Sequence, residues 1–162
     1  MRQLILMRHA KAVATSGADD DFERALAPRG REDAPVVAAA LAAEGATPEI
    51  AIVSDAKRTR ETWELVSRSF PNAKVKFLHA LYLCDAETLM AEAEKAGAES
   101  VMLVGHNPGM HELASRLAHR SNPQEQKLRS KFPTAAGALF TRKDPDSSWK
   151  LQAYVTPKTI SD

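Results

Sequence analysis

The chain has 162 residues, of which 44% are hydrophobic and 27% are charged. This length is typical of one domain, so we expect a single domain over residues 1–162, and the composition excludes disordered and fibrous proteins. The 22 Lys and Arg against 21 Asp and Glu give a net charge of +1. Because this charge creates no overall field for a polyanion, we expect no nucleic-acid partner, and any anion site must be local.

The sequence shows no membrane or export segment. Its longest uninterrupted apolar run, Val36–Ala43, is far shorter than the roughly 20 residues that cross a bilayer. The apolar stretch Leu4–Met7 lies between Arg2 and Arg8, so we expect no signal peptide and no contact with a membrane. Cys84 is the single cysteine and cannot form an internal disulfide. A reducing compartment follows, and we expect a cytoplasmic protein.

Short apolar runs alternate with longer segments of helical spacing. Four of these runs are typical of buried strands, at residues 4–7, 50–53, 75–78 and 101–104. Two later runs, Ala138–Thr141 and Trp149–Val155, flank a polar turn at Asp144–Ser148 and predict a closing hairpin. The alternation predicts an α/β fold in three layers, with a mostly parallel sheet, helices on both faces and a C-terminal hairpin.

The segment between the first two strands predicts a loop followed by a helix. The stretch Thr15–Asp21, which contains an acidic triplet, is typical of a solvated loop. Apolar residues at three- and four-residue spacing then predict a helix that ends at Gly45. Since proline is tolerated in a first turn and breaks an interior one, Pro35 predicts that this helix starts near Arg31–Ala34 or is kinked there.

Three further helices are expected along the chain. One is predicted over Lys57–Ser69, and the next from Asp85, a favoured N-cap, to Ala96. In the fourth, Asn107 is a favoured N-cap and Pro108 occupies the first helical position. This helix would direct its free backbone N–H groups and the positive end of its dipole at the strand end before it.

Polar residues directly follow three of the predicted strands. Arg8 and His9 follow the first strand. Ser54–Arg58 follows the second, and His106 follows the fourth. Because the carboxyl ends of strands in an open α/β sheet share one edge, where ligands bind, we expect two arginines and two histidines to line one pocket there.

Such a pocket is suited to a phosphoryl group. The planar guanidinium of arginine matches phosphate oxygens, and a helix that starts at Asn107 would add backbone donors. Imidazole titrates near neutrality and can act as nucleophile, acid or base. The residues therefore predict phosphoryl binding, with one histidine able to attack phosphorus.

Three motifs occur in register with these strand ends. Leu6–Ala10, with the sequence LMRHA, resembles the Arg-His-Gly signature of the histidine phosphatase superfamily, also called the phosphoglycerate mutase-like superfamily. Ser54–Thr62 is similar to the second arginine motif of that family, and Val104–Asn107 is similar to its second histidine motif. Arg24–Leu26, followed by Gly30, resembles a pattern of its bacterial SixA-type phosphohistidine phosphatases.

This resemblance spans residues 1 to about 141 and implies a phosphoglycerate mutase-like fold without the inserted cap of larger members. It implies that His9 is the nucleophile and becomes transiently phosphorylated, while Arg8, Arg58 and His106 hold the phosphoryl oxygens. Water would then release phosphate. Because cationic side chains can supply the charge that Mg²⁺ supplies in kinases, no metal or other cofactor is required.

Three more side chains are candidates for substrate binding. Arg24 is predicted either to bring a third guanidinium to the phosphate or to solvate its loop. Ser54 is predicted either to hydrogen-bond in the pocket or to cap the following helix. Asn107 is predicted to bind through the helix N-terminus that it begins.

Two departures from the family pattern affect these expectations. Ala10 stands where the motif has glycine, so a φ above zero there would be strained. Many members place a general acid after the third strand, where this chain offers Asp85, which is also a candidate N-cap, and Glu87. A phosphohistidine substrate reduces the need for such an acid, because its leaving imidazole has an ordinary pKa near 6.5. The departure therefore favours cleavage of a P–N bond.

Other motifs give weaker alternatives. Gly105–Gly109 resembles a serine hydrolase elbow but has Asn107 at its centre, and His111 starts an H-E-x-x-H zinc pattern in which Ser115 replaces the second histidine. Cys84 lacks the arginine that closes a cysteine phosphatase loop, so it is predicted to lie in the core or at its rim. Surface or packing roles are predicted for the remaining histidines, which are His79, His111 and His119.

The leading hypothesis is a metal-independent phosphatase that acts through phospho-His9 on phosphohistidine in a protein partner. A phosphomonoesterase that takes a small phosphorylated substrate is the alternative with the same nucleophile. A non-catalytic phosphate-recognition module is the alternative from another functional class.

Overall fold

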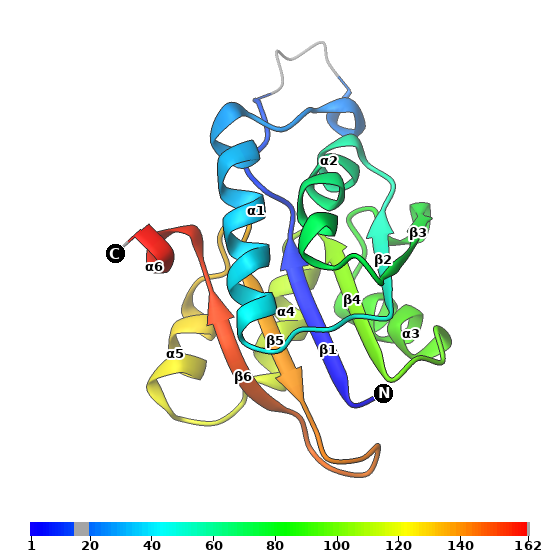
Figure 1. The fold of residues 1–162 in the computed structure, drawn as a ribbon, viewed down its shortest axis with the longest axis vertical. Helices are drawn as coiled ribbons and strands as arrows, with labels where there is room; N and C mark the ends of the chain where they lie inside the picture. The colour runs from blue at the N-terminus through cyan, green and yellow to red at the C-terminus, as the bar shows by residue number, and fades with distance from the viewer. Residues whose placement is uncertain (15–19, 162) are drawn as a thin grey trace.

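A computed structural model of the protein describes residues 1–14 and 20–161. Within these residues, six strands form one sheet in the order β3-β2-β4-β1-β5-β6 (Figure 1). The strands are β1 (Gln3–Arg8), β2 (Ile50–Ser54), β3 (Lys74–Leu78), β4 (Ser100–Gly105), β5 (Gly137–Thr141) and β6 (Lys150–Val155). The first four are parallel, whereas β5 is antiparallel to β1 and to β6. The predicted parallel sheet with a closing hairpin is confirmed.

Helices cover both faces of the sheet, as predicted. One face carries α1 (Pro28–Ala43) and α2 (Lys57–Val66), and the other carries α3 (Ala86–Lys95), α4 (Gly109–Leu117) and α5 (Pro123–Ser130). Short elements complete the chain: η1 (Asp21–Glu23), η2 (Ser67–Ser69), η3 (His79–Leu81) and α6 (Pro157–Ser161).

The two layers of core follow from the alternation of side chains along the strands. In β1, Ile5 and Met7 pack beneath α1 and α2, while Leu4 and Leu6 pack against the helices of the other face. All four side chains are completely buried, which contributes roughly 1.5–3 kcal/mol each to folding. Because β1 is buried on both faces, its sequence is apolar at every interior position.

The start of α1 differs from the prediction. The helix begins at Pro28, before the expected range Arg31–Ala34, because proline fits the first helical position. Pro35 lies inside the helix, where it removes one hydrogen bond. Burial of Val37 and Leu41 against the sheet offsets that loss. Of the predicted loop, residues Thr15–Asp19 lie outside the described residues.

The start of α4 also corrects the prediction. This helix begins at Gly109 with Pro108 as the N-cap residue, and the Asn107–Pro108 peptide bond is cis. Asn107 is therefore not the N-cap; its Nδ2 donates instead to the Phe132 carbonyl at 2.9 Å. The N–H of Met110 donates to the backbone carbonyl of His106, so this first-turn donor is already used.

Other helix boundaries match the prediction, which missed the two short helices α5 and α6. α2 and η2 together span Lys57–Ser69, and α3 follows Asp85, whose carboxylate accepts from Thr88 N at 2.9 Å. α5 was not predicted, although Asn122 caps it and Pro123 occupies its first turn. No helix among the described residues is long and apolar enough to cross a membrane.

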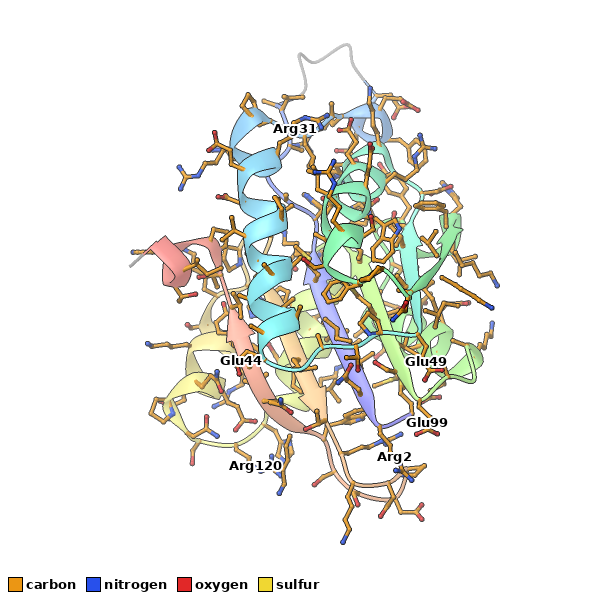
Figure 2. All side chains as sticks on the ribbon, viewed as in Figure 1. Arg2, Arg31, Glu44, Glu49, Glu99 and Arg120 are labelled. Carbon is orange, nitrogen blue, oxygen red and sulfur yellow. The ribbon has the colours of Figure 1, made fainter. Side chains whose placement is uncertain are left out.

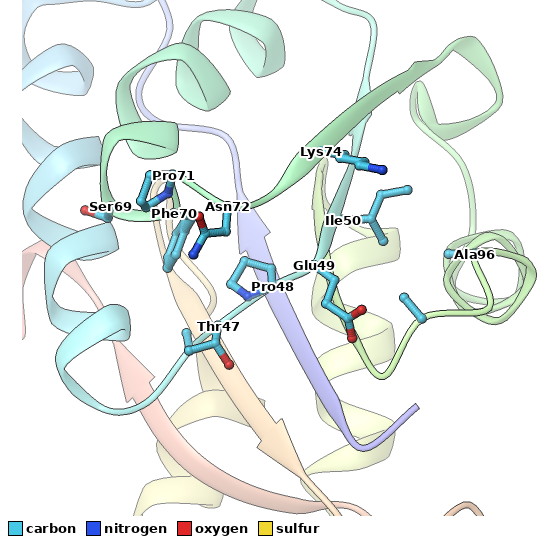
Figure 3. A pocket seen from close by; sticks show the side chains of 12 residues that line it. Thr47, Pro48, Glu49, Ile50, Ser69, Phe70, Pro71, Asn72, Lys74 and Ala96 are labelled. Atoms are coloured by element: carbon cyan, nitrogen blue, oxygen red, sulfur yellow. The ribbon is translucent and has the colours of Figure 1, made fainter.

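The amino ends of the strands form a polar edge opposite the site described below. Arg2, Glu49 and Glu99 lie at this edge (Figure 2). A hollow of about 590 Å³ opens beside it, and its lining includes Thr47, Pro48, Glu49, Phe70 and Lys74 (Figure 3). None of the residues predicted to bind phosphate lines this hollow.

Candidate active site

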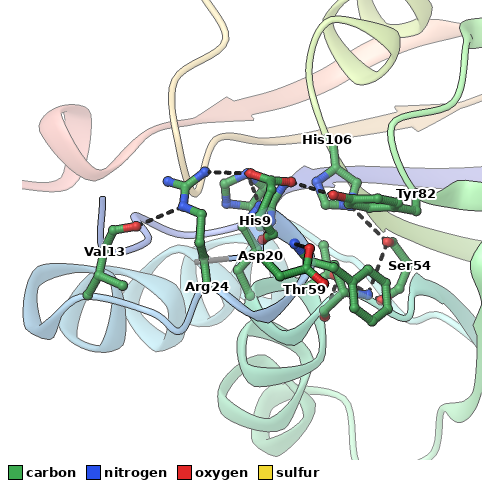
Figure 4. Close-up of polar contacts among 12 residues, drawn as sticks. His9, Val13, Asp20, Arg24, Ser54, Thr59, Tyr82 and His106 are labelled. Atoms are coloured by element: carbon green, nitrogen blue, oxygen red, sulfur yellow. Dashed lines mark hydrogen bonds and ion pairs between the residues drawn. The ribbon is translucent and has the colours of Figure 1, made fainter. Parts of the chain in front are cut away.

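Strand register brings the motif residues together at the carboxyl edge of the sheet. Arg8 of β1 pairs with Gly105 of β4, so the next residues, His9 and His106, become neighbours with ring centroids 5.3 Å apart. β2 lies on the other side of β4 and ends at Ser54. Figure 4 shows His9, His106 and Ser54 gathered at this edge.

His9 has a defined tautomer. Its Nδ1 lies 2.7 Å from the Ala10 carbonyl, and because a carbonyl can only accept, Nδ1 carries the proton and Nε2 has a free lone pair. Burial lowers the pKa of His9, the positive charges of Arg58, Arg8 and Arg24 add to the shift, and the bond to Ala10 opposes it, so that the pKa is about 3. His9 is therefore a neutral base at pH 7.

Arg58 connects His9 to the rest of the site. It stands in the first turn of α2 and is 3% exposed. Its Nε donates to His9 Nε2 at 3.3 Å, which places a guanidinium directly beside the lone pair. Arg8 approaches from β1, where its Nη1 donates to the Phe132 carbonyl at 3.3 Å.

His106 is held by a buried serine. Ser54 is completely buried, and its Oγ lies 2.8 Å from His106 Nε2. Burial, together with smaller contributions from His9 and Arg58, lowers the pKa of His106 to about 3, so this ring is also neutral at pH 7. Of the two roles predicted for Ser54, the hydrogen bond to the pocket histidine is the one observed.

Backbone contacts fix the loop after β1. The N–H of Ala10 donates at 3.0 Å to Thr62 Oγ1, which in turn donates to the Arg58 carbonyl at 2.7 Å. Ala10 does not have a positive φ, so the strain considered for it does not arise. Gly30 is required by close packing, since a Cβ there would lie 2.2 Å from the carbonyl oxygen of Lys11.

These side chains line one cavity of about 370 Å³. Its lining includes all of the predicted phosphoryl-contacting side chains except Ser54: Arg8, His9, Arg24, Arg58, His106 and Asn107. Arg24 enters from the loop after β1 and donates through Nε to the Val13 carbonyl at 2.8 Å (Figure 4). The cavity thus unites residues that lie almost a hundred positions apart in the sequence, as predicted.

The two candidate acids lie elsewhere. Asp85 caps α3, and Glu87 is paired with Arg116 on the surface at 2.6 Å. Neither side chain lines the cavity. The hydrogen bond from Thr88 holds the pKa of Asp85 below its usual value, and the one from Arg116 does the same for Glu87. Both carboxyls are therefore ionised at neutral pH.

The other reactive side chains have ordinary structural places. Cys84 is half-buried, and burial raises the pKa of its thiol to about 11, so it is not a thiolate at neutral pH. His79 is exposed and paired with Asp55, while His111 stacks on Phe132. Neither lines the cavity, and the same is true of His119. Among residues 1–14 and 20–161, no group of His, Cys, Asp and Glu is arranged to hold a metal ion.

Sequence reasoning missed two residues of the site. Asp21 was predicted to lie in a solvated loop, but its carboxylate contacts Arg58 at 3.1 Å and Arg24 at 3.0 Å. Tyr82, which is 61 positions away, donates its hydroxyl to the same carboxylate. The position of Asp21 three residues before Arg24 was a weak indication that the two side chains form an ion pair. Nothing in the sequence pattern indicated Tyr82.

Comparison with known proteins identifies the family. A model of the histidine phosphatase superfamily, branch 1, matches residues 4–82. An uncharacterised chloroplastic protein from Arabidopsis thaliana is 30% identical over 171 residues, which cover 96% of this chain and 78% of that protein. The chain belongs to the histidine phosphatase superfamily. The matched region contains the strand ends that carry His9 and Arg58.

Solved structures of SixA proteins share the whole fold of this histidine phosphatase. A structure from Agrobacterium tumefaciens, assigned as the phosphohistidine phosphatase SixA, is 29% identical, covers 96% of this chain and 98% of its own, and has a TM-score of 0.85. A second from Nakamurella multipartita, with the same assignment, is 26% identical, covers 96% of both chains and has a TM-score of 0.81. The phosphoglycerate mutase-like fold and the SixA-type resemblance are confirmed, and with them the prediction of a phosphatase-type hydrolase.

Proposed function

We propose that this histidine phosphatase removes the phosphoryl group from phosphohistidine on a protein, through transient phosphorylation of His9. The observation that carries the proposal is the hydrogen bond from His9 Nδ1–H to the Ala10 carbonyl. It leaves an unprotonated Nε2 beside the arginines of the cavity, and an imidazole in that state is a nucleophile for phosphorus. The likeness to SixA structures supports a protein phosphohistidine as the substrate.

The phosphoryl oxygens would be held by Arg8, Arg58 and His106. Arg8 Nε and His106 Nδ1 are buried and have no partner among the described residues. If the Ser54 hydroxyl donates to His106 Nε2, then Nδ1 carries a proton that it can donate to an oxygen of the substrate. Buried donors without partners are costly, and a phosphoryl group would satisfy both of them.

The reaction would proceed in two balanced steps. The lone pair of His9 Nε2 attacks phosphorus in line, and the P–N bond to the substrate breaks with its electron pair returning to the substrate ring nitrogen. Water then attacks phospho-His9, the His9 ring recovers the electron pair of the broken P–N bond, and both water protons leave with the product as dihydrogen phosphate. The arginines compensate the charge on the phosphoryl oxygens in both steps, so we propose a metal-independent reaction.

The protonation states of the nearby carboxyl groups favour cleavage of a P–N bond over cleavage of a P–O bond. An alkoxide leaving group needs a general acid, whereas a protonated imidazole leaves as a neutral molecule. Asp85 and Glu87 lie outside the cavity, and Asp21, the carboxylate in its lining, is ionised because the pKa of Asp21 is lowered to about 2 by hydrogen bonds, first of all from Tyr82.

The test is phosphate release by the wild type, His9→Ala and His119→Ala from a phosphohistidine protein and a panel of phosphomonoesters. We expect His9→Ala to lose turnover, the exposed control His119→Ala to keep it, and the wild type to form an acid-labile, base-stable phosphoryl label. Excess EDTA should leave the rate unchanged. Full activity of His9→Ala would overturn the proposed nucleophile.

Two results would favour the alternatives. A preference for P–N bonds below about tenfold, or about 1.4 kcal/mol, would indicate a phosphomonoesterase of broader specificity. Phosphate binding without turnover and without a label on His9 would indicate a recognition module. A large loss of rate in EDTA that one divalent ion restores would contradict the metal-independent mechanism.

A further inference from the structure

The carboxylate of Asp21 lies at the mouth of the cavity. Asp21 begins η1, and its side chain is 43% exposed. It receives Arg58 Nη2 on Oδ2 at 3.1 Å, Arg24 Nη1 on Oδ1 at 3.0 Å and the Tyr82 hydroxyl on Oδ2. Arg58 Nη1 also donates to the Asp21 backbone carbonyl at 2.8 Å. Three side chains therefore fix this carboxylate, of which Arg58 and Tyr82 come from distant parts of the chain.

Asp21 lies on the side of the cavity that a leaving group would occupy. The guanidinium of Arg58 contacts His9 Nε2 through Nε and the Asp21 carboxylate through Nη2, so it stands between the two. In-line displacement places the leaving atom opposite the attacking nitrogen. With His9 at the buried floor and Asp21 partly exposed, the leaving group would project outward toward Asp21.

A cluster of aromatic rings packs beside Asp21, next to the cavity. Phe22 packs edge to face on Tyr82 with ring centroids 5.0 Å apart, and the His79 ring lies 5.7 Å from Tyr82. Tyr82 also contacts His106 edge to face at 5.5 Å. These contacts hold Tyr82, the partner of Asp21, in place.

The ionisation of Asp21 determines which leaving group it suits. The Tyr82 hydroxyl and then Arg24 and Arg58 hold the pKa of Asp21 near 2, although burial opposes the shift. An ionised carboxylate can accept a hydrogen bond and cannot protonate an alkoxide. Phosphohistidine carries a proton on the ring nitrogen distant from phosphorus when its imidazole is protonated, and a carboxylate near that proton favours the protonated form.

We propose that Asp21 is a specificity-determining residue that accepts a hydrogen bond from the distal N–H of the leaving imidazole. This inference rests on the proposed function. When the phosphoryl group binds, Arg58 Nη2 turns to a phosphoryl oxygen and leaves Asp21 Oδ2 to the substrate N–H. His9 Nε2 attacks, the P–N bond breaks, and its electron pair returns to the ring nitrogen. The distal proton stays in place, so neutral imidazole leaves.

The charged and titratable groups around Asp21 come from five parts of the chain. They are Arg24 of its own segment, Arg58 of α2, His79 and Tyr82 in and after η3, Arg8, His9 and Lys11 at and after the end of β1, and His106 after β4. Because both cavity histidines have pKa values near 3, neither changes charge above pH 5. His79, the exposed histidine beside Tyr82, also faces this region, so the pH profile is repeated in a His79→Asn background. A shift on changing Asp21 that persists there would come from the substrate imidazole.

The test compares Asp21→Asn with the wild type on a phosphohistidine protein and on an aryl phosphate, each over a range of pH. We expect kcat/KM for phosphohistidine to fall about tenfold or more, and that for the aryl phosphate to stay within about twofold or to rise because Arg58 is freed. The alkaline limb of the phosphohistidine profile should move down by about one pH unit. Glu23→Gln, which removes an exposed charge from the same turn, is the matched control and should behave as wild type.

The outcomes separate this inference from the proposed function. Equal losses on both substrates would assign Asp21 a structural role in holding Arg58 and would overturn the inference alone. Unchanged phosphohistidine activity in Asp21→Asn would do the same. A wild-type enzyme that cleaves the aryl phosphate and no phosphohistidine would overturn the proposed function itself. Tighter binding of vanadate by Asp21→Asn, together with the selective loss on phosphohistidine, would support the inference.

Discussion

The polar groups at the two edges of the sheet differ in how far their hydrogen-bonding and charge requirements are satisfied. At the amino edge, Glu49 Oε1 accepts from the N–H groups of Glu99 and Ser100 at 3.0 and 3.2 Å, and Arg2 pairs with Glu99 in the open, where the two side chains are 64% and 68% exposed. At the carboxyl edge, buried histidines have strongly lowered pKa values, and the buried Arg8 Nε has no partner within the described parts of the chain.

The difference shows how a binding edge can be told from a structural one. Polar groups at the amino edge satisfy one another, so they need no ligand. Those at the carboxyl edge are kept neutral or unpartnered at a cost to stability, which is expected where groups are arranged for a substrate. Four changes would test this contrast.

The largest effect is expected for Arg58→Lys at the carboxyl edge. Lysine keeps the charge but cannot contact His9 and a phosphoryl group through one planar fork, so kcat/KM should fall about 10²- to 10³-fold. Steady-state kinetics measure this loss. Arg60→Lys, on an exposed side of the same helix, is the control and should retain activity. Similar losses in both variants would show that the helix, and not the site, is sensitive.

The buried histidines should make the fold sensitive to acid. The unfolded chain binds a proton on each histidine below about pH 6.5, whereas folded His9 and His106 bind one only near 3, so the free energy of unfolding decreases as pH falls through that window. Between pH 7.5 and 5 each histidine should account for about 2 kcal/mol.

Urea unfolding at several pH values measures this dependence. In His106→Asn the slope of stability against pH should be smaller by about one proton in the same range. His119→Asn is the exposed control, and its slope should match the wild type. Identical slopes in wild type and His106→Asn would contradict the lowered pKa of His106.

A smaller effect is expected for Ser54→Ala. Loss of the hydroxyl removes the partner of His106 Nε2, so the ring is no longer held in one tautomer, and kcat should fall about tenfold. Ser67→Ala, in η2 on the surface, should leave kcat unchanged. A wild-type kcat in Ser54→Ala would show that Ser54 is not needed to position His106.

The smallest effect on activity is expected at the amino edge. Glu49→Ala removes two hydrogen bonds to backbone N–H groups and should lower the free energy of unfolding by about 1–2 kcal/mol, with kcat/KM unchanged. Thermal unfolding and kinetics on the same sample measure both quantities. A loss of activity without a loss of stability would show that the amino edge also contributes to function and would contradict the contrast between the two edges.

The sequence predicted the sheet and the four side chains at its carboxyl edge because both depend on local pattern. Strands buried on two faces are continuously apolar, and His9 and His106 directly follow such strands. Asn107 shows the limit of local pattern: an Asn-Pro pair favours a helix start, but its amide bonds to Phe132 instead.

Contacts made by the path of the chain could not be predicted in this way. The place of Asp21 depends on how the segment after β1 folds back onto α2, and Tyr82 reaches it from another part of the chain. The helix α5 could have been predicted, since Asn122 and Pro123 form the same Asn-Pro start signal that predicted a helix at Asn107 and Pro108.

The backbone that carries His9 is locked on every side. Its N–H donates to Gly105, its carbonyl accepts from Ala135, and the β1 strand before it lies in the interior of the sheet. Asp21, in contrast, is carried by a turn of three residues. The backbone amide of His9 should therefore exchange its hydrogen as slowly as those of the core, while the amides of the turn that carries Asp21 should exchange faster. Under the proposed mechanism, sequence changes in this turn could alter which leaving groups are accepted without moving His9.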